Sequence, residues 1–420
     1  MESAQDPNDS AIYVLRTEFY SAEMGISNPS GRAFRLHMAG CTPGKHGRFL
    51  EGVMNKAVLL LSRRIALLPI FLMTIVGWAQ NTALFYMTDE PESVRSYYAH
   101  ERKIGILVPA WYKADADGLL IGEPNLAVLE DASQHQLPVM PIIALFDKKA
   151  FHALASKEDA QRTLFARMVQ EARLHQYSGF QLDFENINWT DRDMLSHIVA
   201  EAAKVMHAAN LKLSIATVPN APGYPGGSSL DQFMWRYYRG AYDLQAIGKS
   251  ADQVCLMTYD QHSRWTPPGP VAGWEWTRSN LEYALQAVPK EKLLLGIPLY
   301  GYHWYSGDPF AGTSANEFTG VGEQASPRAN IVADYISGSD AIALKDRFHA
   351  SLEWDKEGRS ARFSFYRDQM LEWVYFTDRQ TFLERLQLAN RQQIGGFCSW
   401  VLGQEDPAVW EVLPDRANAQ

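Results

Sequence analysis

The stretch GFQLDFEN, residues 179–186, alternates strictly between large apolar and polar side chains. Its apolar members are Phe180, Leu182 and Phe184, and its polar members are Gln181, Asp183 and Glu185. Successive side chains of an extended strand point to opposite faces, so two carboxylates project the same way from a strand with an apolar back. Such a strand is either the solvated edge of an antiparallel sheet or part of a site that uses the carboxylates.

From residue 83 onward, short apolar runs alternate with longer stretches that have helical spacing. The predicted strands are 83–87, 104–111, 137–145, 179–185, 211–218, 253–260, 292–300 and 394–403. The predicted helices include 92–102, 158–175, 191–209, 280–288 and 378–391. Strands alternating with helices indicate parallel βαβ units, and eight of them predict a (β/α)8 barrel of the α/β class.

A doubly wound open sheet is the alternative, but no glycine-rich nucleotide turn follows the first strand. In a closed barrel no edge strand exists, so the solvated-edge explanation of GFQLDFEN is excluded. Asp183 and Glu185 then face the barrel interior, and Glu185 emerges at the C-terminal mouth, where active sites lie in this fold.

The seventh and eighth strands are separated by more than one helix requires. The intervening runs ASLEWDKEGRSARFSFY and LEWVYFTDR alternate like antiparallel strands. We therefore predict a small α+β insertion at about 302–378 that builds one wall of a groove, within a barrel domain spanning 81–412 and followed by a tail at 413–420.

Residues 54–80 combine a basic start, an apolar run at 65–78 and a small, polar exit at Ala79 and Gln80. This pattern predicts a secretory signal peptide, and hence export to the periplasm, the cell envelope or the medium. Because a signal peptide starts a chain, we expect Met54 to be the true start and 1–53 a mis-assigned or disordered extension. An uncleaved membrane anchor at 65–79, or an apolar core helix, is the alternative.

Composition narrows the possible partners. The net charge is −9 without a long Lys/Arg run, which argues against nucleic acid. The three cysteines, Cys41, Cys255 and Cys398, form neither a CxxC motif nor a Cys/His cluster, so neither zinc nor a disulfide framework is expected. Cys255 and Cys398 lie in apolar runs and are predicted to be buried thiols. No cofactor is implied, membrane contact is expected only through the signal segment, and the oligomeric state has no signal in the sequence.

Three motifs, in order along residues 82–412, resemble glycoside hydrolase family 18, the chitinase and N-acetylglucosaminidase family. They are SGFQLDFEN at 178–186, LMTYD at 256–260 and GFCSWVLGQED at 396–406. Ser178 and Gln181 stand where the family signature has aspartates. This departure is similar to the peptidoglycan-directed, spore-cortex-lytic branch of the family.

The resemblance implies hydrolysis of β-1,4 bonds next to N-acetylglucosamine, in chitin-like or peptidoglycan glycans, by a substrate-assisted retaining mechanism. It implies that Glu185 is the general acid and that Asp183 orients the 2-acetamido N–H. It also implies that Tyr259 holds the acetamide oxygen and that Trp400 forms the floor of the reacting subsite. The implied lining of this subsite is Asp260, Met257 and Gln181. Residues 255, 257 and 259 share one strand face, as do 398, 400 and 402, so Tyr259 and Trp400 are both predicted to point inward.

The alternative function is a non-catalytic, lectin-like barrel, since a barrel alone does not define an activity. A third possibility is a polysaccharide-processing protein of the envelope that does not hydrolyse chitin. The presence of both Asp183 and Glu185 favours the enzyme. Neither the glycan (chitin, peptidoglycan or an exported polymer) nor the choice between endo and exo cleavage can be read from the sequence.

Overall fold

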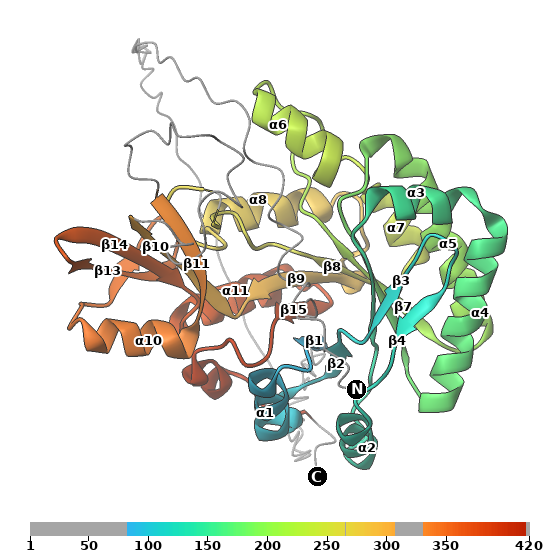
Figure 1. Ribbon diagram of the computed structural model, residues 1–420, viewed down its shortest axis with the longest axis horizontal. Coiled ribbons are helices and arrows are strands. Elements are labelled where there is room, and N and C mark those ends of the chain that lie inside the picture. Colours follow the sequence, from blue (N-terminus) through green and yellow to red (C-terminus); the bar gives the residue numbers. More distant parts are fainter. Residues whose placement is uncertain (1–81, 265, 307–330, 417–420) are drawn as a thin grey trace, which may run out of the picture. The chain divides into compact units, whose positions relative to one another are not determined.

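The computed structural model describes residues 82–264, 266–306 and 331–416 (Figure 1). The predicted extension at 1–53 and the predicted signal segment at 54–80 lie outside the described residues, as do 307–330 of the predicted insertion and the end of the tail. Within the described part of the chain, no helix is long and apolar enough to cross a membrane.

Eight parallel strands form the barrel. They are β1 (Thr82–Met87), β2 (Ile106–Pro109), β5 (Ile142–Leu145), β6 (Gly179–Phe184), β7 (Lys212–Thr217), β8 (Gln253–Leu256), β9 (Leu293–Pro298) and β15 (Gly396–Trp400). Hydrogen-bonded neighbours run in the order β2-β1-β15-β9-β8-β7-β6-β5. A parallel bridge between Leu107 and Val139 joins β2 to the segment entering β5 and closes the ring. The predicted (β/α)8 barrel is confirmed, and the open doubly wound sheet is excluded.

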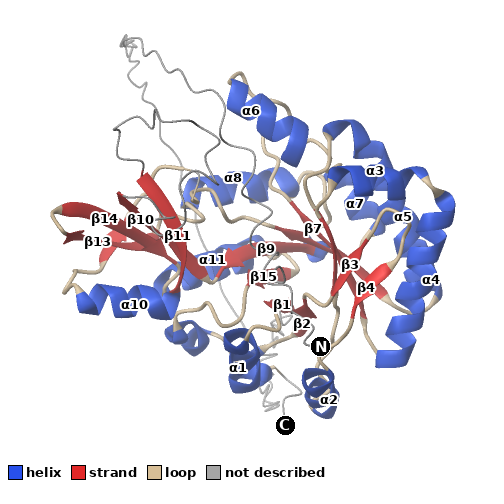
Figure 2. Ribbon diagram, viewed as in Figure 1, coloured by secondary structure: helices blue, strands red, loops and turns tan. Residues whose placement is uncertain are grey.

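Helices cover the outside of these strands (Figure 2). They are α1 (Pro91–His100), α2 (Leu126–Gln134), α3 (Lys148–Ser156), α4 (Glu158–His175), α5 (Arg192–Ala208), α7 (Leu244–Ser250), α8 (Trp274–Ala284) and α11 (Arg379–Gln392). A further helix, α6 (Ser229–Met234), belongs to the connection after β7 and has no buried residue. Helix α4 shows why they form where they do: Leu164, Phe165, Met168 and Ala172 recur at helical spacing and are buried against the sheet. The helix ends at Gln176, whose left-handed conformation terminates the turn.

Several predicted boundaries differ from the structure. The run 137–145 is a strand only from Ile142 onward, because Pro138 and Pro141 lack the N–H that a ladder needs. Strand β8 ends at Leu256 rather than at residue 260, and α8 begins earlier than the predicted 280. A hairpin of β3 (Tyr112–Ala114) and β4 (Leu120–Gly122), which the strand prediction missed, extends the sheet beside β5.

In its described residues, the insertion between β9 and β15 is a five-stranded antiparallel sheet with one helix, seen in orange and red in Figure 1. Its strands are β10 (Tyr300–Ser306), β11 (Ile331–Ser337), β12 (Glu353–Asp355), β13 (Ser360–Arg367) and β14 (Met370–Phe376), and its helix is α10 (Gly338–Arg347). The strand order is β11-β10-β14-β13-β12. The α+β insertion predicted at about 302–378 is thus present.

The barrel has two cores, one on each face of its strands. Phe180, Leu182 and Phe184 belong to the large cluster between strands and helices. A second cluster fills the barrel interior, with members from six of the eight strands: Leu84, Tyr86, Val108, Ile142, Cys255, Leu294 and Cys398. Strict alternation along each strand produces this separation. It confirms that Gln181 and Asp183, which alternate with the outer apolar residues, face the interior.

Candidate active site

The acid pair lies at the end of β6. Asp183 is 8 % exposed inside the barrel, and Glu185 follows Phe184, the last residue of the strand, where the backbone N–H of Glu185 donates to Leu145 O at 3.1 Å. Glu185 is partly exposed, as a group that must reach a substrate has to be. The structure therefore places both carboxylates where the alternation predicted, at the C-terminal mouth of the barrel.

Tyr242 fixes the strand end between the two carboxylates. Its hydroxyl donates to Phe184 O at 2.8 Å, and its own carbonyl accepts from the Asn220 side chain at 3.0 Å. Asn220 also lines a hollow of about 310 Å³ beside the loop that follows β7, together with Tyr224 and Arg239. Tyr242 lies in a loop without a periodic pattern, which is why the sequence analysis did not identify it.

Gln181 lies at the centre of a buried hydrogen-bonded chain. The Ser214 hydroxyl donates to Gln181 Oε1 at 2.6 Å, and Gln181 Nε2 donates to the Tyr86 hydroxyl. The Tyr86 hydroxyl in turn donates to Cys255 Sγ at 3.1 Å. A disulfide sulfur can only accept, so the direction of the whole chain follows from this last bond. Gln181 was predicted to line the substrate subsite, but it is fully buried beneath the acid pair.

Tyr86 connects the acid pair with Trp400. Burial raises the pKa of the Tyr86 hydroxyl well above its usual value, and the nearby Asp183 carboxylate raises it further. The phenol therefore keeps its proton and remains a donor. Its ring centroid is 5.3 Å from that of Trp400. Tyr86 lies on the first strand at an interior position, so alternation along 83–87 could have identified it.

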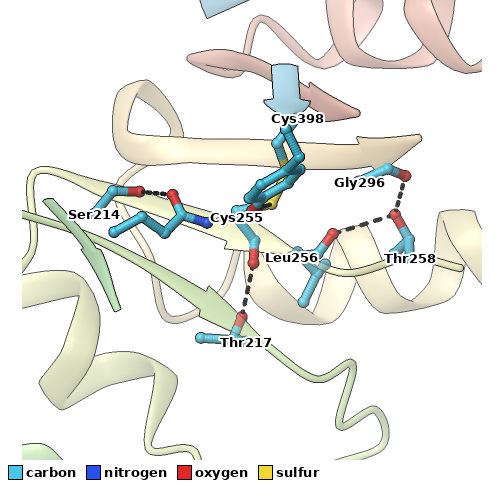
Figure 3. The surroundings of a disulfide bond; sticks show 9 residues. Ser214, Thr217, Cys255, Leu256, Thr258, Gly296 and Cys398 are labelled. Atoms are coloured by element: carbon cyan, nitrogen blue, oxygen red, sulfur yellow. Dashed lines mark hydrogen bonds between the residues drawn. A yellow bond between two sulfur atoms is a disulfide. The ribbon is translucent and has the colours of Figure 1, made fainter. Parts of the chain in front are cut away.

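Cys255 and Cys398 form a disulfide, which corrects the prediction that both are buried thiols (Figure 3). Both side chains are fully buried in the barrel interior, and their Cα atoms are 6.1 Å apart. The two residues are 143 positions apart, on strands that are not neighbours in the sheet. Nothing in their sequence spacing indicates that they meet.

Met257, Tyr259 and Trp400 meet the insertion in one cluster, which we call the mouth cluster. Its further members include Ala216, Val271, Tyr300, Tyr302, Trp304, Ala333 and Tyr375, with Tyr335 and Trp373 packed against it. The barrel mouth and the insertion thus share one largely aromatic cluster.

The strict alternation of side-chain facing ends where strands β8 and β15 end. After Leu256 the chain turns tightly, with Tyr259 N–H donating to Met257 O at 2.8 Å, and still brings both side chains into the mouth cluster. After Trp400 the prediction for residue 402 is wrong, because Val401 joins the interior cluster and Leu402 joins the outer one.

Asp260 joins the barrel to the insertion. Its Oδ1 accepts hydrogen bonds from Tyr300 at 2.6 Å and Tyr302 at 3.0 Å, both on β10. Its backbone has a φ of 59°, a left-handed conformation that aspartate tolerates better than most residues. These hydrogen bonds give Asp260 a part in holding the insertion against the barrel.

Ser178, the other departure from the family signature, joins the residue before β6 to the segment that enters β5. Its hydroxyl and its backbone N–H both donate to Val139 O, at 3.0 and 2.9 Å. Within the described residues, no group of three or more His, Cys, Asp or Glu side chains could hold a metal ion.

A family model described as "Glycosyl hydrolases family 18" matches residues 111–405, more than half of the chain. The chain belongs to this family, and it is a glycoside hydrolase. The comparisons give no support to the lectin-like alternative.

Curated relatives and solved structures agree with this assignment. The chain is 23% identical over 368 residues to an uncharacterized glycosylase, YvbX, of Bacillus subtilis, covering 85% of this chain and 98% of the relative. It is 26% identical to the cortical fragment-lytic enzyme of B. subtilis, covering 73% of this chain and 66% of the relative. The fold is similar to that of the spore cortex-lytic enzyme SleL of Bacillus megaterium (TM-score 0.66, 22% identity, 79% of this chain and 73% of that chain). It is equally similar to that of a chitinase of Chromobacterium violaceum (TM-score 0.66, 24% identity, 79% and 97%).

Proposed function

We propose that the protein cleaves β-1,4 bonds next to N-acetylglucosamine in cell-wall glycan, with Glu185 as the general acid. The observation that carries this proposal is the placement of two carboxylates on one face of β6 at the barrel mouth. Side chains two apart on a strand have Cα atoms about 6.5–7 Å apart, so Asp183 lies beside the acid, not across the sugar from it. A carboxylate in that position can orient a substrate group, and so supports a substrate-assisted mechanism.

The proposed reaction proceeds in two steps. Glu185 protonates the glycosidic oxygen while the 2-acetamido carbonyl oxygen of the same sugar attacks its anomeric carbon, forming an oxazolinium ion. Asp183 accepts the acetamide N–H and stabilises the positive charge, Tyr259 holds the acetamide oxygen, and Trp400 stacks under the ring. Glu185, now a carboxylate, then takes a proton from a water molecule that attacks the anomeric carbon. This attack opens the oxazolinium ring and gives net retention of configuration at the anomeric carbon.

Two features favour wall glycan over chitin. Gln181 and Ser178 depart from the family signature in the manner of its cortex-lytic branch, and relatives named as cortical fragment-lytic enzymes match 73% of this chain. The glycan class is the part of the proposal that the experiment below decides.

The test compares the purified protein with Glu185→Gln and with a matched control, Glu158→Gln. Glu158 is a highly exposed glutamate on α4 that pairs with Arg162 and is not part of the mouth cluster. N-acetylglucosamine oligosaccharides and purified peptidoglycan are offered, and products are followed by mass spectrometry and by NMR of the new anomeric centre. We expect Glu185→Gln to lose about 10²–10⁴-fold in rate while still binding, and Glu158→Gln to match the wild type. Binding without cleavage by all three proteins would contradict the proposal and indicate a lectin-like barrel.

We also propose that the protein is exported. The predicted signal segment at 54–80 supports this, as does the Cys255–Cys398 disulfide, because such bonds persist in oxidising compartments. N-terminal sequencing of the native protein should find a start near Asn81. Tryptic peptides from 1–53 would contradict the start at Met54, and release from membranes only by detergent would indicate an anchor at 65–79.

A further inference from the structure

The disulfide holds together two strands that the sheet itself keeps apart. Strand β9 lies between β8 and β15 in the sheet. Neighbouring strands are spaced about 4.7–4.9 Å, so strands on either side of a third would lie about 9.5 Å apart in a flat sheet. The Cα atoms of Cys255 and Cys398 are 6.1 Å apart. The crosslink thus defines a local closure of the barrel that backbone hydrogen bonds alone do not make.

Gly296 provides the space for this closure. It lies on β9 in register with Cys398, and Figure 3 shows it beside the bridged strands. A Cβ at this position would collide with the carbonyl oxygen of Leu256. The ladder between β8 and β9 also ends at Leu256 and Leu295, one residue beyond the crosslink on β8. Above this level the segment after β8 is tied to β9 by the Thr258 hydroxyl, which donates to Gly296 O at 2.7 Å, and to β15 by the disulfide just below.

The residues directly above the crosslink form the floor of the groove. Trp400 follows Cys398 by two residues on β15, and Met257 follows Cys255 by two. Tyr259 lies two residues further along, and all three contribute to the mouth cluster. A shift of β8 relative to β15 would therefore change the separation of Tyr259 and Trp400, the two groups assigned to the acetamide and the sugar ring.

The crosslink also acts on the acid strand through hydrogen bonds. Cys255 Sγ accepts from the Tyr86 hydroxyl, which accepts from Gln181, two residues before Asp183. A disulfide sulfur cannot donate, whereas a thiol can. Reduction would thus convert a fixed acceptor into a possible donor and release the Tyr86 hydroxyl from the orientation it has beneath the carboxylates.

We propose that Cys255 and Cys398 are a pair of positioning residues whose disulfide sets the catalytic geometry, so that full activity requires their oxidised form. In the reduction, a small dithiol gives up two electrons and two protons and becomes a disulfide itself. The Sγ–Sγ bond breaks, and each cysteine gains one S–H. The kinetic part of this proposal rests on the proposed function.

The first experiment compares the full-length wild type with the double variant Cys255→Ala/Cys398→Ala and with Val108→Ala. Val108 belongs to the same interior cluster but lies on β2 and has no part in the crosslink. At a temperature well below every melting point, we expect kcat of the double variant to fall about 10- to 100-fold with a smaller change in KM, and kcat of Val108→Ala to stay near the wild type. A kcat within twofold of the wild type in the folded double variant would overturn the proposal.

The second experiment reduces the wild type with a dithiol and counts thiols by alkylation and mass spectrometry. Activity should fall in proportion to the thiols released from Cys255 and Cys398 and return on reoxidation, whereas residual activity of the double variant should not respond. If the double variant fails to fold, this titration decides: activity that persists after both thiols are released refutes the proposal.

Amide hydrogen exchange tests the positioning role of the disulfide independently of the proposed substrate. On reduction, exchange should accelerate in 257–260 and 400–403 and remain unchanged in α4. If the wild type cleaves none of the glycans offered, the proposed substrate is wrong, and exchange still reports on the crosslink. Unchanged exchange in both segments after full reduction would refute the positioning role whatever the substrate.

Discussion

Gln181 stands beside Asp183 at a position where the family signature has a second aspartate. Its amide donates to Tyr86 and accepts from Ser214, and both bonds are buried. An amide cannot take up a proton or carry charge, so it cannot share a proton with Asp183. We therefore expect Asp183 to remain ionised throughout the reaction, with the neutral chain beneath it serving to hold the strand in place.

Gln181→Asp tests this role. The substitution removes the donor to Tyr86 and buries a further carboxylate next to Asp183. We expect it to lower the free energy of unfolding by about 1–3 kcal/mol, measured by urea denaturation, without raising kcat. Gln161→Asp is the matched control: Gln161 is a buried glutamine on α4 whose amide donates to Ala155 O at 2.9 Å, so stability should fall while kcat is kept. A many-fold gain in rate for Gln181→Asp would show that the native site is impaired.

The facing of single residues could be predicted where they lie on a strand. Alternation through 179–185 placed Gln181, Asp183 and Glu185 on the interior side, as found. It failed for residue 402, which lies two residues beyond the end of β15 at Trp400. It could not pair Cys255 with Cys398, because their contact depends on how the barrel curves across β9, and no local pattern reports that curvature.

The two faces of strand β10 contact different clusters of side chains. Tyr300, Tyr302 and Trp304 face the mouth cluster, while His303 faces the side covered by α10. There His303 Nε2 lies 2.5 Å from Glu372 Oε2, and Arg367 pairs with the same carboxylate at 2.7 Å. Strand β10 thus carries the mouth cluster on one face and a partly buried polar cluster on the other.

The stability of the insertion should depend on pH through His303. Burial lowers the pKa of the His303 imidazole, with Glu372 opposing the shift. The unfolded chain, in which histidine has its ordinary pKa of about 6.5, then binds more protons than the folded protein as the pH falls below that value. Stability is therefore lost as the pH drops through about 6.5 towards the folded pKa.

We expect urea midpoints at pH 5.5 and 7.5 to differ less for His303→Gln than for the wild type, because glutamine titrates in neither state. An unchanged difference between the two midpoints would show that His303 does not contribute.

Element boundaries were harder to predict than element types. Helix α4 begins and ends where its apolar spacing indicated, whereas Pro138 and Pro141 shortened a run whose apolar composition looked continuous. The hairpin of β3 and β4 carries a recognisable signal in its Asp117–Gly118 turn, since Gly118 has a φ of 79°. Its strands are three residues each, too short for an alternation to be visible.

In the whole molecule, Arg385 ties the insertion to the barrel. It is a fully buried residue of α11 whose guanidinium donates to Arg359 O at 2.7 Å, to Gly358 O at 2.8 Å and to Ala272 O. The first two acceptors belong to the turn between β12 and β13, and the third precedes α8. Burial lowers the pKa of Arg385 to about 10, so the side chain remains charged at neutral pH.

Arg385→Met should lower the free energy of unfolding by about 3 kcal/mol or more, because three buried carbonyl groups lose their donor. Arg391→Met is the control, since Arg391 is exposed on the same helix and loses only a contact 5.7 Å above the Trp274 ring, so the change should cost no more than about 1 kcal/mol. Equal unfolding midpoints for the two variants in urea would contradict the role given to Arg385.

The eight-fold alternation of strands and helices made the barrel predictable as a whole, and the long interval before the last strand made the insertion predictable. How the two meet was not, because the contacts of Arg385 and Asp260 join segments separated by 25 residues or more. Such tertiary contacts have no counterpart in local sequence patterns.

Barrel closure also determines how much of the chain must be synthesised before it can hydrolyse a substrate. The first strand pairs with the last, Thr82 with Gly396, and that last strand brings both Cys398 and Trp400. A growing chain that already contains Asp183 and Glu185 lacks both the β1–β15 pairing and the proposed sugar-stacking residue Trp400 until its final strand has been made. We therefore expect chains that are interrupted before β15 to be inactive, and only finished molecules to cleave glycan.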